Sequence, residues 1–357
     1  MDPPPPLKID EDPWFATRVA FGTTLAFVAA MAFDVVMPML PAVITSSLMA
    51  TSRGAMDLKK VIGGGVIIPL MTLLSAFVVQ AIRGEMLVFL TFMIAITFFA
   101  MLVVMKTGQR MGLMLVIFPH LLGMLGVTSD IAMEAMRDGF VAAGLIAIPV
   151  IMLSYLLFRP RTSVAWQEVA TPPAFDKPWL EAALRTVATA PVLIAFYLWV
   201  DPSNIIYAVM VIMVLVYPNR HQQRREAMGR FLSTITGGAV ALLMVGVVTM
   251  QPTIPVTLIA LFLGCLWFGW RMVSDPERLY THQIAMTVFI SVGLGALGTL
   301  GATGGTDPFT STVQRLMLTA GGVLFALIAL YLLRWLFARE TFHDVYPRRW
   351  STANASR

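Results

Sequence analysis

Long apolar segments constrain this chain more than any other feature. A helix needs about 20 apolar residues to cross the hydrocarbon core of a bilayer. Only 13% of the 357 residues are charged, against about 25% in ordinary globular domains. The sequence therefore predicts an all-α polytopic membrane protein. The predicted spans are 17–36, 38–52, 61–82, 86–105, 110–128, 138–158, 183–200, 203–218, 231–250, 253–271, 280–300 and 312–337.

Basic residues are distributed unevenly between the segments that join these spans. If the N-terminus lies inside, all but three of the 25 Lys and Arg fall in cytoplasmic segments. The exceptions are Arg83, Arg137 and Arg315. Because Lys and Arg in short loops mark the cytoplasmic side, we expect an even number of spans. Both termini and the central connector are then cytoplasmic.

The two halves of the chain carry charged residues at matching spacing. Each half has an arginine early in its first span, an aspartate 16 residues later and another arginine 35 residues later. These residues are Arg18, Asp34 and Arg53 in the first half, and Arg185, Asp201 and Arg220 in the second. The spacing predicts two tandem parallel repeats of about six transmembrane helices, related by an axis along the membrane normal. Arginines that set topology would also recur in a duplicated protein, so the repeat alone does not identify a binding site.

The spans and the repeat divide the chain into five segments. The start, MDPPPPLKIDEDPW, is acidic and rich in proline, unlike the basic and then apolar start of a signal peptide. The expected segments are a disordered N-terminal tail at 1–16, a first transmembrane repeat at 17–158, a cytoplasmic connector at 159–182, a second transmembrane repeat at 183–338 and a cytoplasmic tail at 339–357.

The chain resembles the fusaric acid resistance and aromatic acid exporter family of bacterial inner-membrane proteins. It also looks like a fused pair of the six-span units of plant aluminium-activated malate transporters. The resemblance rests on the six-plus-six layout, the early arginine of each half, and a short second span that runs into a basic turn. These turns are LMATSRGAMDLKK at 48–60 and VLVYPNRHQQRREAMGR at 214–230.

The resemblance implies export of organic anions, often aromatic carboxylates, across the bacterial inner membrane. It also implies a periplasmic adaptor, a membrane fusion protein, as a partner. Many members of the family carry a large cytoplasmic domain, whereas the connector here is short. We therefore expect any function of that domain to be absent or supplied by another protein. A homo-oligomer stays open, because one duplicated chain can do the work of two subunits.

Basic residues at the predicted inner mouth are candidates for binding the anion. A guanidinium holds a carboxylate through two parallel hydrogen bonds, and rings of positive charge select anions. The predicted ring consists of Arg18, Arg53, Arg185 and Arg220, extended by Lys60 and Arg230. The alternative is that these arginines extend to the membrane surface and only fix the orientation of the chain.

Three further residues are candidates for proton coupling. His120 follows Pro119 about ten residues into its predicted span, roughly 15 Å deep, and ionisable residues at such depth are usually functional. The alternative is a neutral histidine hydrogen-bonded to a neighbouring helix. Asp34 and Asp201 end the first span of each half. They either take up protons, pair with an arginine, or cap the following helix.

Several classes of protein are disfavoured. The sequence has no GxxxxGK[ST], HExxH or GxSxG motif, so we expect neither ATP hydrolysis nor an enzyme. We expect no metal and no cofactor, since the single cysteine and four histidines show no ligand spacing. The basic stretch at 217–230 is interpreted as a cytoplasmic turn, so we expect the partners to be a small organic anion and the lipid bilayer, with no nucleic acid. An uncoupled anion channel of the same fold is the main alternative to a proton-coupled exporter.

Overall fold

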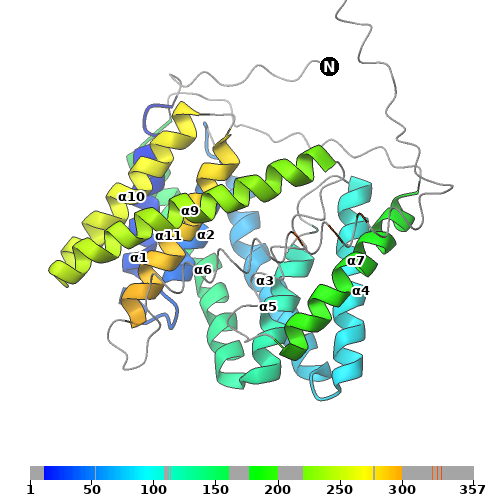
Figure 1. Ribbon diagram of the computed structural model, residues 1–357. Coiled ribbons are helices and arrows are strands. Elements are labelled where there is room, and N and C mark those ends of the chain that lie inside the picture. Colours follow the sequence, from blue (N-terminus) through cyan, green and yellow to red (C-terminus); the bar gives the residue numbers. More distant parts are fainter. Residues whose placement is uncertain are drawn as a thin grey trace, which may run out of the picture.

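The computed structural model describes residues 12–52, 54–107, 112, 114–160, 177–199, 220–275 and 278–299, together with residues 324, 328 and 331. Ten helices account for most of this part of the chain (Figure 1). They are α1 (Phe15–Ala32), α2 (Met39–Ala50), α3 (Leu58–Ile82), α4 (Met86–Thr107), α5 (Met114–Thr128), α6 (Asp130–Leu157), α7 (Pro178–Trp199), α9 (Arg220–Met250), α10 (Ile254–Ser274) and α11 (Leu279–Thr299).

The predicted all-α membrane fold is confirmed for the described residues. Seven of the described helices are long and apolar enough to cross a bilayer, namely α1, α3, α4, α6, α9, α10 and α11. Helices α2 and α5 are apolar but shorter. Each of these ten helices coincides with a predicted span. The predicted spans 203–218 and 312–337 lie outside the described residues, apart from three isolated positions in the second.

Helices α6, α7 and α9 begin several residues earlier than predicted. Helix α9 begins at Arg220 rather than 231, because the turn RHQQRREAM is made of good helix formers and contains no proline. Helix α6 begins at Asp130 rather than 138, since the Ser129 hydroxyl caps it by accepting from the Ala132 amide at 3.2 Å. Helix α7 begins at Pro178 rather than 183, and proline is well suited to a first helical position. In each case the helix continues beyond the apolar segment into polar sequence.

The described helices form two large apolar clusters and one small one, and both large clusters contain residues from the two halves of the chain. Helix α7 packs against α4 and joins the cluster of α3, α4, α5 and α6. Helix α1 packs against α10 and joins a cluster that also contains residues of α2, α3, α6, α9 and α11. Both pairs can be followed in Figure 1, with α1 and α10 on the left and α4 and α7 on the right. The core therefore joins the two halves.

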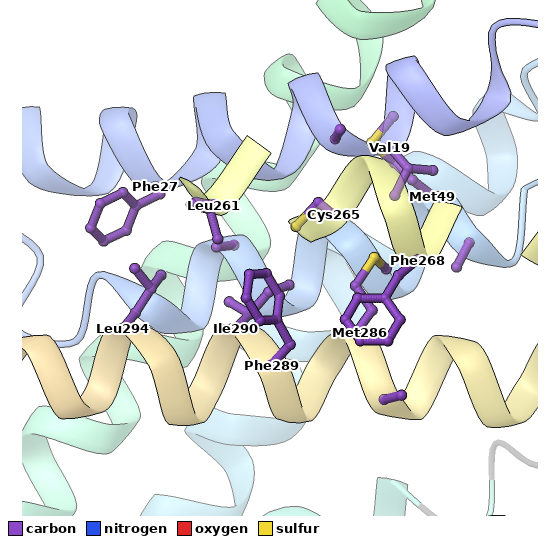
Figure 2. Close-up of a cluster of buried hydrophobic side chains, with 14 of the residues drawn as sticks. Val19, Phe27, Met49, Leu261, Cys265, Phe268, Met286, Phe289, Ile290 and Leu294 are labelled. Carbon is purple, nitrogen blue, oxygen red and sulfur yellow. The ribbon is translucent and has the colours of Figure 1, made fainter. Parts of the chain in front are cut away.

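The second cluster is filled by large side chains from several helices, among them α1, α2, α10 and α11. Val19 and Phe27 of α1 face the cluster from one side, and residues of α11 face it from the other (Figure 2). Helix α10 lies between them and contributes Phe268, which is fully buried. The remaining labelled residues of this cluster are Met49, Leu261, Cys265, Met286, Phe289, Ile290 and Leu294.

One end of the bundle, here called the basic end, holds most of the described basic residues. It comprises the N-terminal ends of α1, α3, α5, α7, α9 and α11 and the C-terminal ends of α2, α4, α6 and α10. The opposite end holds only Arg83 and Arg137 among the described Lys and Arg. There Arg83 forms an ion pair with Asp130 and donates to the Gly126 carbonyl at 3.0 Å. This separation of charge agrees with the distribution predicted from the loops.

Two glycines allow α3 and α6 to approach closely. A Cβ on Gly65 would overlap the Ile148 side chain, and a Cβ on Gly144 would lie 2.5 Å from the Gly65 carbonyl oxygen. Small residues at such positions let helix backbones pack directly against each other in membranes. Gly65 and Gly144 therefore allow the close approach of α3 and α6.

Replacing Gly65 by leucine is expected to push α3 away from α6 and to lower stability by about 1–3 kcal/mol, as overpacking does. Gly63→Leu is the matched control, because an added Cβ there meets no atom within 4 Å. Thermal unfolding in detergent, followed by circular dichroism, measures both variants. Equal melting temperatures would contradict the close packing of α3 and α6.

Candidate functional site

Arg18 is buried in the first turn of α1 at the basic end, with only 1% of its side chain exposed. Its guanidinium faces the carboxylate of Asp12, just before the helix. Nη2 lies 2.5 Å from Oδ2 and Nη1 lies 3.3 Å from Oδ1. This is the two-pronged geometry that a guanidinium offers to a carboxylate. Arg18 thus neutralises a carboxylate of the same chain.

The Arg18 guanidinium also connects three segments of the first half. Nη1 donates to the Phe158 carbonyl at the end of α6, at 3.1 Å. The guanidinium carbon lies 4.2 Å from the centre of the Tyr155 ring, within the range of a cation–π contact. The Tyr155 hydroxyl in turn donates to the Ser52 carbonyl beyond α2, at 2.5 Å. Arg18 therefore organises the basic end of α1, α2 and α6.

Arg185 occupies the corresponding place in α7 and is fully buried. Nε and Nη2 donate to the same carboxylate oxygen of Glu181, at 2.8 and 2.5 Å. Glu181 is four residues earlier on the same helix, so the two side chains share one face. Both predicted arginines are therefore paired with a carboxylate, but the carboxylate of Asp12 precedes its helix whereas that of Glu181 is part of it.

Arg230 and Lys60 occupy different environments at the basic end. Arg230 is buried in α9 and its Nη2 donates to the Tyr280 hydroxyl at the start of α11, at 3.0 Å. Nearby, the Ser233 hydroxyl lies 2.8 Å from the Thr281 carbonyl. Lys60 is exposed in the first turn of α3. Arg230 thus joins two helices of the second half, while Lys60 faces outward.

Some of the predicted site residues are outside the part of the chain that the structure describes. Arg53 and Asp201 are outside the described residues, and Arg220 begins α9 but its side chain is not described. The convergence of the four arginines into one ring therefore stays a prediction. Among the described residues, no group of three His, Cys, Asp or Glu lies close enough to hold a metal ion.

His120 is completely buried in α5 and is hydrogen-bonded on both ring nitrogens. Nδ1 lies 2.9 Å from the Val116 carbonyl, which can only accept, so Nδ1 carries a hydrogen. Nε2 lies 3.2 Å from the Thr97 hydroxyl of α4, and that hydroxyl lies 2.8 Å from the Met93 carbonyl. His120 therefore contacts a neighbouring helix, as the alternative interpretation predicted.

The single hydroxyl hydrogen of Thr97 permits two arrangements at His120. If the imidazole is neutral, Thr97 donates to Nε2. If the imidazole is protonated, Nε2 donates to Thr97 and the hydroxyl donates to the Met93 carbonyl instead. Both arrangements satisfy Nε2, because a hydroxyl both donates and accepts. The Tyr197 hydroxyl of α7 donates to the His120 carbonyl at 3.3 Å, which links this group to the second half.

Asp34 lies in the turn after α1, and its side chain is exposed. Its backbone φ of 50° is in the left-handed region, which aspartate tolerates better than most residues. Helix α2 has Pro38 at its N-cap and no side-chain capping hydrogen bond. The interpretation of Asp34 as a cap for α2 is therefore wrong, and its proton-coupling role stays a prediction.

The partners of the buried side chains of Arg18, Arg185 and His120 were not predicted from the sequence. Glu181 could have been found, because it precedes Arg185 by one helical turn. Asp12 lies in a segment interpreted as a disordered tail, so no periodic pattern pointed to it. Thr97 and Tyr197 carry no sequence signal either, because their contacts with His120 join residues 23 and 77 positions apart.

Residues 192–329 match the family model described as fusaric acid resistance protein-like. The match covers less than half of the chain and supports the resemblance to this family that the sequence suggested. The seven long apolar helices among the described residues agree with a multi-pass membrane protein. No curated protein and no solved structure matches the chain.

Arg185→Met is expected to be strongly destabilising. The change leaves the buried Glu181 carboxylate without its guanidinium, which costs about 3–5 kcal/mol when a buried pair is broken. The double variant Arg185→Met with Glu181→Met removes both charges and should melt at a higher temperature than the single variant. Melting curves in detergent test this order. A double variant no more stable than the single one would show that the pair is not what stabilises this region.

Proposed function

We propose that this protein exports organic anions, aromatic carboxylates in particular, from the bacterial cytoplasm across the inner membrane. The observation that carries the proposal is the pair of buried arginines at the basic end, each holding a carboxylate. A cargo with the same chemical group fits the same geometry. The match of the second half to the fusaric acid resistance-like model supports the choice of cargo class.

The proposed exporter is a duplicated six-helix unit, with the pathway between the two halves. The family model covers most of one predicted half. In the predicted repeat α1 is equivalent to α7, and α4 is equivalent to α10. Helix α1 packs on α10 and α7 packs on α4, so the two contacts are equivalent, which supports a two-fold relation between the halves. The contacts of α3 with α5 and of α9 with α11 form a second equivalent set.

The cargo carboxylate replaces Asp12 on Arg18 in this mechanism. Exposing a buried guanidinium without a counter-charge would be costly. Exchanging one carboxylate for another keeps the guanidinium neutralised throughout. Asp12 suits this exchange because it precedes α1, so its carboxylate moves away without unwinding the helix. The Tyr155 ring, 4.2 Å from the guanidinium carbon, holds Arg18 in place during the exchange.

Proton coupling is assigned to His120. The Thr97 hydroxyl accepts from or donates to Nε2, so the imidazole gains and loses a proton without leaving Nε2 unsatisfied. Tyr197 connects His120 to α7, and α7 also carries Arg185. A change in protonation at His120 is therefore transmitted to α7, a helix of the other half, through the hydrogen bond from Tyr197.

The orientation and partners complete the proposal. The basic end faces the cytoplasm, because basic residues accumulate on that side of a membrane protein. Both termini and the connector are then cytoplasmic. The opposite end faces the periplasm, where a membrane fusion protein serves as the adaptor. Assembly of several copies is compatible with this arrangement.

Removing the carboxylate of Asp12 is expected to tighten cargo binding, since Asp12→Asn frees the Arg18 guanidinium. The double variant Asp12→Asn with Arg18→Gln keeps the net charge unchanged but removes the Arg18 guanidinium. Cargo binding should then weaken about 10- to 100-fold, the contribution of a hydrogen bond to a charged group. Calorimetric titration of the purified protein with benzoate and with hexanoate measures both effects. Comparing the two ligands also measures the preference for an aromatic over an aliphatic carboxylate. Parent affinity in the double variant would exclude Arg18 as the cargo site.

Transport in inverted vesicles with an imposed pH gradient distinguishes the coupled exporter from an uncoupled channel. We expect the parent protein to accumulate benzoate against its gradient. Thr97→Val should reduce accumulation, because it removes the hydroxyl that serves both protonation states, while His120→Gln should abolish accumulation and leave downhill flux. Downhill flux that ignores pH in the parent protein would favour the channel. Undiminished accumulation in His120→Gln would remove His120 from the coupling mechanism.

A further inference from the structure

A groove at the basic end lies between the C-terminal part of α2 and the N-terminal part of α3. Its volume is about 310 Å³. One end of the groove is polar and basic, with Lys59, Lys60, Thr51 and Ser52 in its lining. The other end is apolar and includes Ile67. Its lining therefore suits a ligand that is anionic at one end and apolar at the other.

The groove continues along an exposed face of α3. Gly63, Ile67, Leu70, Leu74 and Phe77 follow one another at intervals of three or four residues, so they lie on one side of the helix. Leu70, Leu74 and Phe77 are 57%, 54% and 71% exposed. From Gly63 to Leu74 this face is roughly 16 Å long at 1.5 Å per residue, about half the thickness of the bilayer core. Its length matches one acyl chain in one leaflet.

The three consecutive glycines of α3 differ in what they face. Gly64 lies against Leu48 of α2, and Gly65 lies against α6. Gly63 has no atom within 4 Å of the position of an added Cβ, and it lines the groove. Helix packing thus accounts for two of these glycines, and the hollow at Gly63 leaves room for a ligand.

The positive charge in the groove comes from the lysine side chains. Asp57 caps α3 by accepting from the Lys59 and Lys60 amides at 3.1 and 3.3 Å. The free amides of a helix start are thereby partly satisfied. A lysine ammonium binds phosphate as a compact point charge. Two adjacent lysines beside an apolar face complement a phosphate that carries an acyl chain.

We propose that the α2–α3 groove binds an anionic phospholipid, with its phosphate at Lys59 and Lys60 and one acyl chain along the exposed face of α3. Basic pockets between membrane helices are suited to anionic head groups. This site is separate from Arg18 and Arg185, and the proposal does not depend on the transported cargo. A bound lipid would fill the groove and hold the start of α3 against the end of α2.

The test measures lipid binding to the full chain by native mass spectrometry, titrating with phosphatidylglycerol and with phosphatidylcholine. We expect phosphatidylglycerol to bind at least tenfold more tightly. Gly63→Leu fills the groove and should abolish this preference. Gly246→Leu is the matched control, because Gly246 is an exposed helical glycine of α9 with no atom within 4 Å of an added Cβ. This control should keep the preference, and melting curves of both variants establish that they fold.

Lys59→Gln and Lys60→Gln probe the charge. Each is expected to weaken phosphatidylglycerol binding roughly fivefold, the contribution of one basic residue near an anionic surface, and to leave phosphatidylcholine binding unchanged. Unchanged phosphatidylglycerol binding in Gly63→Leu would overturn the proposal. So would equal binding of the two lipids to the parent protein. Complete displacement of the lipid by millimolar inorganic phosphate would assign the groove to a soluble oxyanion and exclude the lipid.

Discussion

The packing of α1 and α7 against helices of the other half is the constraint on which the rest of the structure depends. Helix α1 buries Val19 and Phe27 among residues of α10 and α11, and α7 buries Leu193 and Tyr197 among residues of α4 and α5. Helix α1 also packs on α2 and α6 of its own half, so it joins the first half to the second. In a bilayer, where lipid tails are as apolar as leucine, such close packing is what holds helices together.

These two helices also carry Arg18 and Arg185, the buried arginines that are paired with carboxylates at the basic end. A guanidinium inside a helix bundle is tolerated only when it is paired and hydrogen-bonded. Glu181 lies on α7 itself, so the pair with Arg185 is fixed by the helix. Asp12 lies before α1, so its ion pair with Arg18 is not fixed by the geometry of the helix. The two sites are thus unequal despite the similar sequence. This difference favours Arg18 for exchange with a mobile carboxylate and favours Arg185 for stabilising α7.

Hydropathy predicted the existence and order of the described helices because each needs an apolar segment long enough to pack in the bundle. It did not predict where α9 begins, because the first residues of this helix, RHQQRREAM, are mostly polar. The arginines were found because their spacing is repeated, but their partners depend on tertiary structure. Asp12 is separated from a predicted helix by a proline, and Thr97 meets His120 only because α4 packs on α5. Gly64 and Gly65 of α3 lie against neighbouring helices, whereas Gly63 lines a groove. Which side of α3 meets a neighbour is decided by the whole bundle.

The two proposed anion sites at the basic end differ in burial and in the type of cation. Arg18 is buried, and its planar fork matches a carboxylate through two directed contacts. Lys59 and Lys60 are exposed beside an apolar face, and their hydrated ammonium groups attract charge without fixing its orientation. A phospholipid is too bulky to reach a guanidinium that is 1% exposed, and a small carboxylate gains little from lysines that stay in water. The same positive end can therefore hold a lipid at its surface and a carboxylate inside without the two ligands competing for one site.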